Sequence, residues 1–358
     1  MNHKISVLII DDSAFMRKSI SIMLESDPDI KVIGTARNGL EGYESAKKLK
    51  PDIITLDIEM PVMDGLTALK KIMADCPTPV IMVSSLTTEG AEATLQALEL
   101  GAVDFIPKEL SYVNVNITKI KEDLISKVKE IVKQRLLSDR LNRLRKITQK
   151  IKQENIPTQQ IPHLELPKMM YKAISIGIST GGPLSLQKTI PLLSEKIRVP
   201  IFVVQHMPPK FTKSLAERLN NLSKLNVKEA EDGEKIENGT IYIAPGGYHM
   251  TVKSNGNNGA VIDISEYPND TLHRPSVDVM MNSVIDYYGK NMLGVIMTGM
   301  GKDGFEAIKH LKSIGGHAIA QDEETCVVYG MPKAIVDGGL ADTVLPLEKI
   351  PETINKVV

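Results

Sequence analysis

Short apolar runs alternate with amphipathic helical patterns along the first third of the chain. Residues at helical spacing fill the intervals between these runs. Runs of this length predict buried strands, and the alternation of strand with helix is typical of a parallel sheet covered by helices on both faces. The predicted strands are 5–10, 53–56, 80–83 and 102–106, and the predicted helices are 13–25, 38–49, 64–74 and 89–99.

A second series of the same kind begins near Lys172. Its strand candidates are 172–178, 200–205, 241–244, 293–298 and 317–320. Two separate series predict two α/β domains, each a doubly wound parallel sheet, and we expect the domains at 1–130 and 169–358 with a linker at 131–168.

The linker differs in character from both series. Residues 138–153 include six basic residues and only one acidic residue. Leucine and isoleucine recur at helical spacing from Leu137 to Ile151, so the last helix of the first domain is predicted to continue into this segment. Pro157, Pro162 and Pro167 then end any helix. A solvated helical linker is the favoured interpretation. A basic patch for RNA or lipid stays open, although no aromatic residue interleaves the charges.

Composition narrows the class of protein. The 358 residues are 42% hydrophobic and 24% charged, which is typical of a soluble globular protein, and a formal net charge of -1 favours neither nucleic acid nor an anionic membrane. No apolar run is long enough to span a bilayer, and no apolar leader follows Met1. The two cysteines, Cys76 and Cys326, form no paired motif. We therefore expect a cytoplasmic protein without membrane insertion or a nucleic-acid partner.

Polar residues follow the predicted strands of the first domain. Asp11 and Asp12 follow the first strand, Asp57 directly follows the run at 53–56, and Ser84 and Lys108 follow the next two strands. Because the carboxyl ends of parallel strands share one edge of a sheet, these five residues should converge. Carboxylates suit Mg²⁺ and can accept a phosphoryl group, which Lys108 and the Ser84 hydroxyl would stabilise. One such residue alone would be an ordinary turn or capping residue.

With these residues in place, the first domain resembles the response-regulator receiver family over about residues 4–125. The matching features are the Asp-Asp pair, LDIEMPVMDG around Asp57, Ser84, and Pro107-Lys108. The resemblance implies a flavodoxin-like fold and phosphorylation of Asp57 by a chemotaxis histidine kinase. It also implies Mg²⁺ at Asp11, Asp12, Asp57 and the Glu59 carbonyl, with Ser84, Phe105 and Lys108 as switch residues.

The second domain opens with a G-x-S-x-G motif. Its first strand runs into Gly177-Ile178-Ser179-Thr180-Gly181, followed by a helical pattern. Small residues on both sides allow a sharp strand-to-helix turn that exposes the Ser179 hydroxyl. A glycine-rich turn with Ser179 as helix N-cap is an equally good interpretation of this motif alone.

Two further strand ends supply the partners that a nucleophilic serine needs. His206 follows the strand 200–205, and Asp303 lies in the loop after 293–298. A base beside the hydroxyl and an acid that orients this base are the requirements for acyl transfer, and triads are defined by geometry rather than chain order. His249 and Arg274, in other loops, could line a substrate cleft or serve only local packing.

Two alternatives from other classes stay open on the residues. Gly299, Gly301 and Gly304 spell G-x-G-x-x-G between a strand and a helix, with Asp322 about twenty residues on, as in dinucleotide-binding sites. Against this, the Asp303 carboxylate would repel a pyrophosphate held in the same loop. The second alternative is a binding regulator without chemistry.

The second domain resembles the methylesterase domain of the CheB family over about residues 170–350. The matching segments are GISTGG, VVQHMPP, IYIAPGGYHM, RPSVDVMM, MTGMGKDG and CVVYGMP. The resemblance implies a Rossmann-like fold with Ser179 as nucleophile, His206 as general base and acid, Asp303 as the orienting acid, and the N–H groups of Thr180 and Met300 as oxyanion donors.

The resemblance also implies a function for the whole chain. It implies a hydrolase that removes methyl esters from glutamates and deamidates particular glutamines on methyl-accepting chemotaxis receptors, with no cofactor for the hydrolytic step. The unphosphorylated receiver is expected to cover the cleft near Ser179. Phosphorylation is expected to loosen this contact and so to raise the hydrolase activity.

Overall fold

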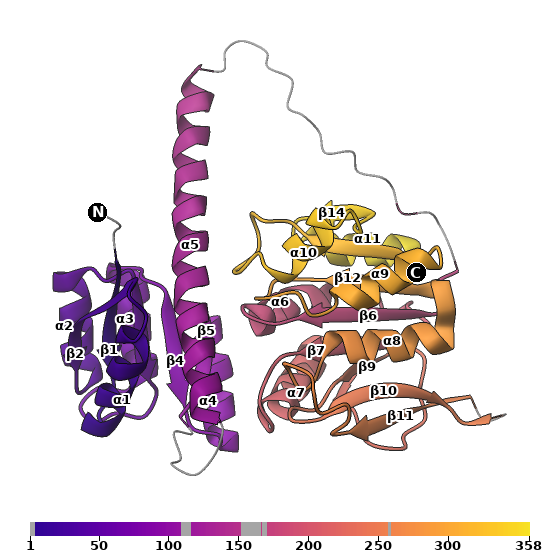
Figure 1. Ribbon diagram of the computed structural model, residues 1–358, viewed down its shortest axis with the longest axis horizontal. Helices are drawn as coiled ribbons and strands as arrows, with labels where there is room; N and C mark the ends of the chain where they lie inside the picture. Colours follow the sequence, from indigo (N-terminus) through magenta and orange to yellow (C-terminus); the bar gives the residue numbers. More distant parts are fainter. Residues whose placement is uncertain (1–3, 109–115, 152–165, 167–169, 257–258) are drawn as a thin grey trace. The chain divides into compact units, whose positions relative to one another are not determined.

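The computed structural model describes residues 4–108, 116–151, 166, 170–256 and 259–358. The chain divides into two compact units, Met1–Asp139 and Arg140–Val358, each with its own parallel sheet (Figure 1).

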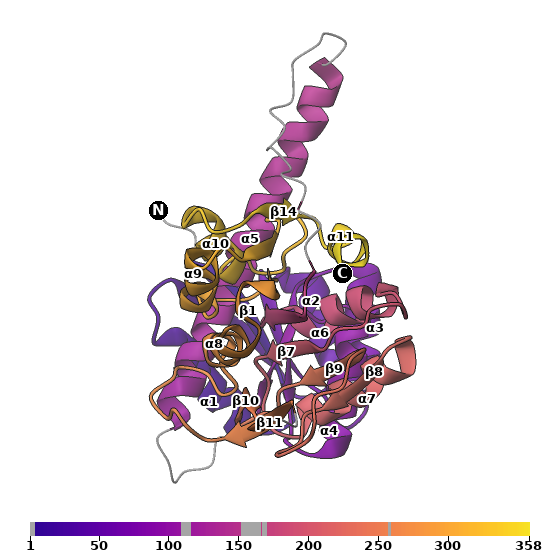
Figure 2. The same ribbon diagram turned by 90° about the vertical axis from the view of Figure 1, so that its right-hand side faces the viewer.

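Five parallel strands in the order β2-β1-β3-β4-β5 form the sheet of the first unit, which is the flavodoxin-like order. The strands are β1 (Ile5–Ile10), β2 (Ile30–Ala36), β3 (Ile53–Asp57), β4 (Val80–Ser84) and β5 (Asp104–Pro107). The helices are α1 (Ala14–Glu25), α2 (Gly39–Leu49), α3 (Gly65–Asp75), α4 (Thr88–Glu99) and α5 (Asn116–Ile151). Helices α2, α3 and α4 follow one another on one face, while α1 and α5 lie on the other (Figure 2).

The central strands explain why the pattern is so readable. Every residue of β3 and β4 is buried, as parallel strands covered on both faces require. Strand β2 was not predicted from the pattern, because it lies at the sheet edge with only its two end residues buried. The hydroxyl or carboxylate of Ser13, Asp64 and Thr87 caps α1, α3 and α4, so polar residues directly start the helices.

Seven parallel strands form the sheet of the second unit, in the order β14-β13-β12-β6-β7-β9-β8. The strands of this unit are β6 (Ala173–Ile178), β7 (Ile201–Gln205), β8 (Asn226–Glu229), β9 (Thr240–Ile243), β10 (His249–Ser254), β11 (Ala260–Ser265), β12 (Met292–Ile296), β13 (His317–Gln321) and β14 (Thr343–Leu345). Strands β10 and β11 pair separately as an antiparallel hairpin. Strands β7, β9 and β8 lie on one side of β6, and β12, β13 and β14 lie on the other. The order in which the chain adds strands to the sheet therefore reverses next to β6.

Helices cover both faces of this second sheet (Figure 2). They are α6 (Gly182–Thr189), α7 (Phe211–Leu222), α8 (Val277–Tyr288), α9 (Phe305–Ser313), α10 (Met331–Asp337) and α11 (Lys349–Val357), with 3₁₀ turns η1 (Ile190–Leu192) and η3 (Gly289–Asn291). Helices α8, α9 and α10 pack on one face and α6, α7 and α11 on the other, and α8 also packs against β10. The fully buried methionines Met280, Met281 and Met292 belong to the core between α8 and the sheet.

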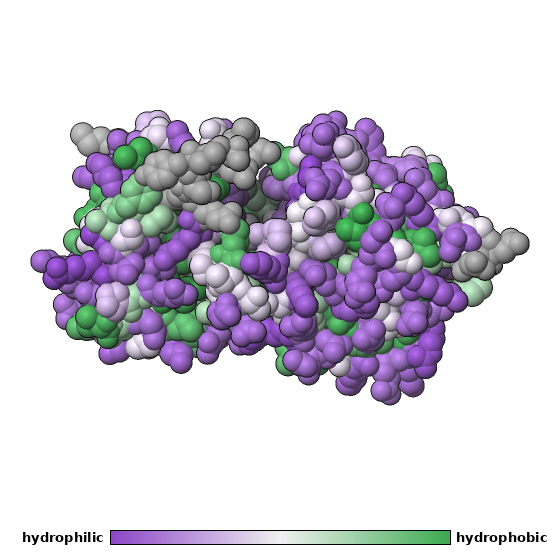
Figure 3. Space-filling model, turned by 90° about the horizontal axis from the view of Figure 1, so that it is seen from below, coloured by the Kyte–Doolittle hydropathy of each residue, from purple (hydrophilic) through white to green (hydrophobic). Residues whose placement is uncertain are grey.

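The long helix α5 continues through Ile151, which confirms the helical continuation indicated by the leucine spacing. Residues 152–165 and 167–169, with Pro157, Pro162 and Pro167, lie outside the described residues. The basic side chains of 138–153 also lie outside them, so a basic patch there is not tested. The linker limits at 131 and 168 stay predictions. No helix in the described ranges combines the length and apolarity needed to cross a bilayer. Figure 3 shows a surface on which hydrophobic residues form small scattered patches among hydrophilic ones.

One largely buried cation, Lys127, holds α5 to the sheet of the first unit. The Lys127 ammonium lies 3.1 Å from the Asp104 carboxylate and 3.3 Å from that of Asp123, and donates to the Phe105 carbonyl at 3.0 Å. Burial by itself would lower the pKa of Lys127, but the two carboxylates outweigh it and raise this pKa above its usual value. The ammonium therefore stays charged and ties α5 to β5 beside Phe105.

Replacing Lys127 by methionine should destabilise the first unit by about 3 kcal/mol, because the buried Asp104 loses its cation. The measurement is hydrogen exchange of the β5 and α5 amides in the full chain. Lys133→Met is the control: Lys133 is 64% exposed and pairs along the helix with Glu130, so its loss should cost less than about 0.5 kcal/mol. Equal protection in both variants would contradict the anchoring role of Lys127.

Candidate active site

A tight turn places Ser179 between β6 and α6. The Ser179 N–H donates to the Thr298 carbonyl at 3.0 Å, and the Ser179 carbonyl accepts from the Gly182 N–H at 2.8 Å and from Gln205 Nε2 at 2.9 Å. Gly181 has a φ of +76°, and a Cβ on Gly182 would overlap the Gln205 carboxamide. The N-cap of α6 is Gly181, so Ser179 is not a capping residue, and the sharp strand-to-helix turn is the correct interpretation of the motif.

His206 bridges Ser179 and Asp303. Its Nδ1 lies 3.1 Å from Ser179 Oγ, and its Nε2 lies 2.8 Å from Asp303 Oδ2. Because a carboxylate only accepts hydrogen bonds, the proton of neutral His206 belongs on Nε2, and Nδ1 presents its lone pair to the hydroxyl. The three residues follow the carboxyl ends of β6, β7 and β12, which are neighbours at the point where the strand order reverses.

The N-terminus of α8 holds the Asp303 carboxylate. It accepts hydrogen bonds from the Val277 N–H at 2.7 Å, the Asp278 N–H at 2.9 Å and the Ser276 hydroxyl at 3.0 Å. Burial alone would raise the pKa of Asp303, but the bond and charge of His206 together with these donors outweigh burial and lower this pKa well below its usual range. Asp303 therefore stays ionised and can both orient His206 and stabilise its protonated form.

Asp278 is a second carboxylate beside Asp303. It accepts from the Ala307 N–H at 2.8 Å, which ties α8 to α9. Burial, together with the charge of Asp303, raises its pKa to about 6 against the opposing backbone hydrogen bonds. Near pH 6 Asp303 is fully ionised whereas Asp278 is only partly ionised, because only Asp303 is paired with His206.

Two backbone N–H groups beside Ser179 are unused. Within the described residues, no group accepts a hydrogen bond from the N–H of Thr180 or Met300. The loop that carries Met300 is held close by Gly299, whose N–H donates to the Val328 carbonyl at 3.0 Å, and a Cβ on Gly299 would lie 2.8 Å from Ser179 Cβ. Both N–H groups are available to a developing oxyanion.

The first unit gathers three carboxylates at the carboxyl ends of its strands. One oxygen each of Asp11, Asp12 and Asp57 lies within 4.8 Å of the others, and the Lys108 ammonium lies 2.7 Å from Asp57 Oδ1. Burial raises the pKa of Asp57, and burial with the charge of Asp57 raises that of Asp11 to about 6. The buried Oδ2 atoms of Asp11 and Asp57 have no hydrogen-bond partner among the described residues. Unpartnered carboxylate oxygens at this spacing fit a hard divalent cation.

Ser84 and Phe105 lie nearby in β4 and β5. The Ser84 hydroxyl donates to the Gly90 carbonyl at 3.1 Å and accepts from the Thr94 hydroxyl at 2.7 Å, so it is engaged with α4. Phe105 is buried. The Glu59 N–H donates to Asp57 Oδ1 at 3.3 Å, which holds the loop after β3 against the Asp57 carboxylate. The Glu59 carbonyl as a metal ligand stays a prediction.

Comparison with known proteins gives the family. Residues 174–354 match the CheB methylesterase family, and residues 7–117 match the response regulator receiver domain. A protein-glutamate methylesterase/protein-glutamine glutaminase of Pyrococcus abyssi is 46% identical over 99% of this chain and 94% of its own length. One from Oleidesulfovibrio alaskensis is 48% identical over 99% of both chains. The chain belongs to the CheB methylesterase family.

A solved member of the CheB family agrees with the fold of the second unit. The crystal structure of the Thermotoga maritima CheB methylesterase catalytic domain is 47% identical in sequence and superposes with a TM-score of 0.51, covering 53% of this chain and all of that one. The prediction of a receiver joined to a CheB methylesterase, each built on a parallel sheet, is confirmed.

The structure brings the predicted site residues of this CheB chain into two groups, the carboxylates with Lys108 in the first unit and the residues around Ser179 in the second. Ser179, His206 and Asp303 form one hydrogen-bonded chain, with the Thr180 and Met300 N–H groups beside it. The dinucleotide alternative fails on the loop after β12, because Asp303 occupies it and binds His206 there. Of the two roles left open for His249, local packing is the one that the structure supports, because His249 starts strand β10, is fully buried and accepts the Ser276 N–H at Nδ1. Arg274 pairs with Glu266 at 3.3 Å.

Sequence reasoning missed the residues that support the triad. Ser276 and the two following N–H groups bind Asp303, and the ring of His273 stacks on His206 with centroids 4.2 Å apart. A serine followed by a helical pattern indicates an N-cap, but not what the helix end would bind. No pattern in the sequence points to His273, since it lies in a loop 67 positions beyond His206.

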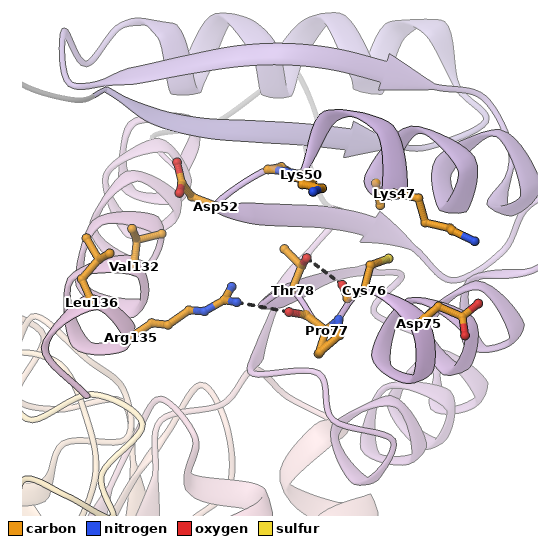
Figure 4. A pocket seen from close by; sticks show the side chains of 12 residues that line it. Lys47, Lys50, Asp52, Asp75, Cys76, Pro77, Thr78, Val132, Arg135 and Leu136 are labelled. Atoms are coloured by element: carbon orange, nitrogen blue, oxygen red, sulfur yellow. Dashed lines mark hydrogen bonds between the residues drawn. The ribbon is translucent and has the colours of Figure 1, made fainter. Parts of the chain in front are cut away.

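A groove of about 520 Å³ lies on the receiver of this CheB chain, away from the acidic cluster (Figure 4). It opens between α5 and the loops before β3 and β4, at the amino ends of these strands. Lys50 and Arg135 lie on its walls with Asp52 and Asp75, and Arg135 donates to the Pro77 carbonyl at 3.2 Å. None of the predicted site residues lines it.

Replacing Asp278 by asparagine should remove a pH dependence of stability. The folded pKa of Asp278, about 6, exceeds its unfolded value, so its contribution to the free energy of unfolding is greatest below pH 4 and is lost as pH rises towards 6 and above. Asparagine cannot ionise, so the variant should gain about 1 kcal/mol relative to the wild type between pH 4.5 and 7.5.

The measurement is calorimetric melting of the full chain at both pH values. Asp286→Asn, at an exposed position on the same helix, is the matched control and should show no such gain. A difference between Asp278→Asn and wild type that is the same at pH 4.5 and 7.5 would contradict the raised pKa.

Proposed function

We propose that this chain hydrolyses glutamate methyl esters and deamidates particular glutamines on methyl-accepting chemotaxis receptors, under control of phosphorylation at Asp57. The observation that carries the proposal is the continuous chain of hydrogen bonds from Ser179 Oγ through both nitrogens of His206 to Asp303. Relatives that match the whole chain are named protein-glutamate methylesterase/protein-glutamine glutaminase, which supports the substrate class. A cytoplasmic location fits such a partner and a histidine kinase as phosphodonor.

The first half-reaction transfers the acyl group to Ser179. As Ser179 Oγ attacks the side-chain acyl carbon, His206 Nδ1 takes the hydroxyl proton and the carbonyl oxygen becomes an oxyanion. The N–H groups of Thr180 and Met300 stabilise this oxyanion. His206 then gives its proton to the methoxy oxygen or the amide nitrogen, and methanol or ammonia leaves.

The second half-reaction restores the enzyme. Water attacks the acyl carbon of the Ser179 ester and passes one proton to His206, which returns it to Ser179 Oγ. The glutamate side chain leaves as a carboxylic acid and loses its remaining proton to solvent. In both halves His206 carries a transient positive charge. The ionised Asp303 lies 2.8 Å from its Nε2 and stabilises that charge.

The receiver supplies the control. Asp11, Asp12, Asp57 and the Glu59 carbonyl would hold Mg²⁺, which neutralises the incoming phosphoryl group when bound. Lys108 already contacts Asp57 and would bind a phosphoryl oxygen. Ser84 would exchange its hydrogen bonds with Gly90 and Thr94 for one with the phosphoryl group, which would repack α4 and the side of β5 that carries Phe105.

Ser179→Ala should abolish methanol release from methylated receptor while Asp57 is still phosphorylated by a small phosphodonor with Mg²⁺, because the two groups lie in different units. Ser313→Ala, an exposed serine at the end of α9, is the control and should keep full activity. Substantial methanol release by the Ser179 variant would remove Ser179 as nucleophile.

Asp303→Asn should keep the fold but reduce turnover by about 10⁴-fold, on the scale of the same change in a serine protease, because the amide can stabilise the wrong His206 tautomer. Initial rates of methanol release, with a thermal melt of each protein, give the comparison. Asp337→Asn, an exposed residue that pairs along α10 with Lys333, is the control. A loss smaller than about tenfold would show that another acid orients His206.

A further inference from the structure

A second imidazole covers one face of His206. The rings of His206 and His273 are stacked, with centroids 4.2 Å apart and an angle of 20° between their planes. Both nitrogens of His206 are already engaged at its edges, by Ser179 and Asp303. The ring face is therefore the place where a further residue can act on His206 without displacing either partner.

The segment that carries His273 is fixed by the buried His249. His249 Nδ1 accepts the Ser276 N–H at 3.2 Å, and its Nε2 lies 3.0 Å from the Pro268 carbonyl. The Gly247 N–H also donates to the Arg274 carbonyl at 3.1 Å. His273 is thus held between anchored points on both sides, and the same anchor at Ser276 starts the helix that binds Asp303.

A stacked aromatic face matters most when His206 is charged. Neutral His206 gains only packing from the contact, whereas an imidazolium stacked on an aromatic ring gains an additional cation–π attraction. His206 carries this charge only while it holds the proton of Ser179 or of water. An interaction that strengthens at that moment raises kcat rather than lowering KM.

We propose that His273 is a positioning residue for the hydrolysis, and that its aromatic face fixes the ring plane of His206 and stabilises the imidazolium form. The inference rests on the proposed function of His206 as the proton-transfer group. With this role for His273, the loop between β11 and α8 contributes to the hydrolysis. The buried His249 then contributes by anchoring that loop.

Three replacements of His273 separate an aromatic face from simple packing. His273→Phe keeps a flat aromatic ring, His273→Leu keeps apolar bulk without one, and His273→Ala removes both. His310→Ala, an exposed histidine on α9 that contacts Asn282, is the control for loss of a histidine. The readouts are kcat and KM for methanol release by the full-length chain with a small phosphodonor and Mg²⁺.

We expect kcat to fall about tenfold in the Leu and Ala variants, equivalent to about 1.4 kcal/mol in the barrier, with KM within about twofold of wild type. The Phe variant should stay within about threefold of wild type in kcat. Equal activity of the Leu and Phe variants would overturn the proposal, since bulk alone would then suffice. A Phe variant as slow as the Ala variant would also overturn it.

A second readout does not depend on turnover. In ¹⁵N-histidine-labelled protein, the Nε2–H resonance of His206, assigned by its loss in His206→Gln, should persist in the Phe variant and broaden in the Leu and Ala variants. An unchanged resonance in all three would overturn the proposed fixing of the ring. If instead Ser179→Ala and His206→Gln released methanol normally, the proposed function would fail, while the spectra would still report on the stacking.

Discussion

Parallel strands place all their carboxyl ends on one edge of a sheet, and both halves of this protein depend on that constraint. In the first unit it gathers Asp11, Asp12 and Asp57 with Lys108, although almost a hundred residues separate the first from the last. In the second it brings together Ser179, His206 and Asp303 at the point where the strand order reverses. A side chain needs only to follow a buried strand to reach such a site.

The two sites handle buried carboxylates in opposite ways, and this difference fits their chemistry. Asp303 has a complete set of partners, since His206 and the N-terminus of α8 offset its burial and keep it ionised. Asp11 and Asp57 each have one oxygen, Oδ2, without a hydrogen-bond partner in the part of the chain that the structure describes, and burial raises the pKa of both. A satisfied carboxylate holds one permanent geometry for repeated turnover. The unpartnered oxygens of Asp11 and Asp57 are available to bind a cation or to react with a phosphoryl group.

Close backbone packing provides the precision of the hydrolytic site. A side chain on Gly182 would overlap Gln205, whose carboxamide holds the Ser179 carbonyl, and one on Gly299 would press on Ser179 itself. The loops after β6, β7 and β12 can approach each other only because these positions lack a Cβ. The hydroxyl, the imidazole and the free N–H groups are therefore set by backbone contacts as much as by the side chains that perform the chemistry.

The sequence alone determined the two parallel-sheet units, the strand ends that carry Asp57, Ser179, His206 and Asp303, and the continuation of α5 to Ile151. These features depend on local periodicity and on burial of central strands, which are readable from residue types. It did not reveal β2, whose edge position leaves it half polar, nor the burial of His249. Only the tertiary structure decided which nitrogen of His206 faces Ser179, that α8 begins at Asp303, and that His273 stacks on His206. These contacts join loops that are far apart in the chain, and their geometry is set by packing, for which no local pattern exists.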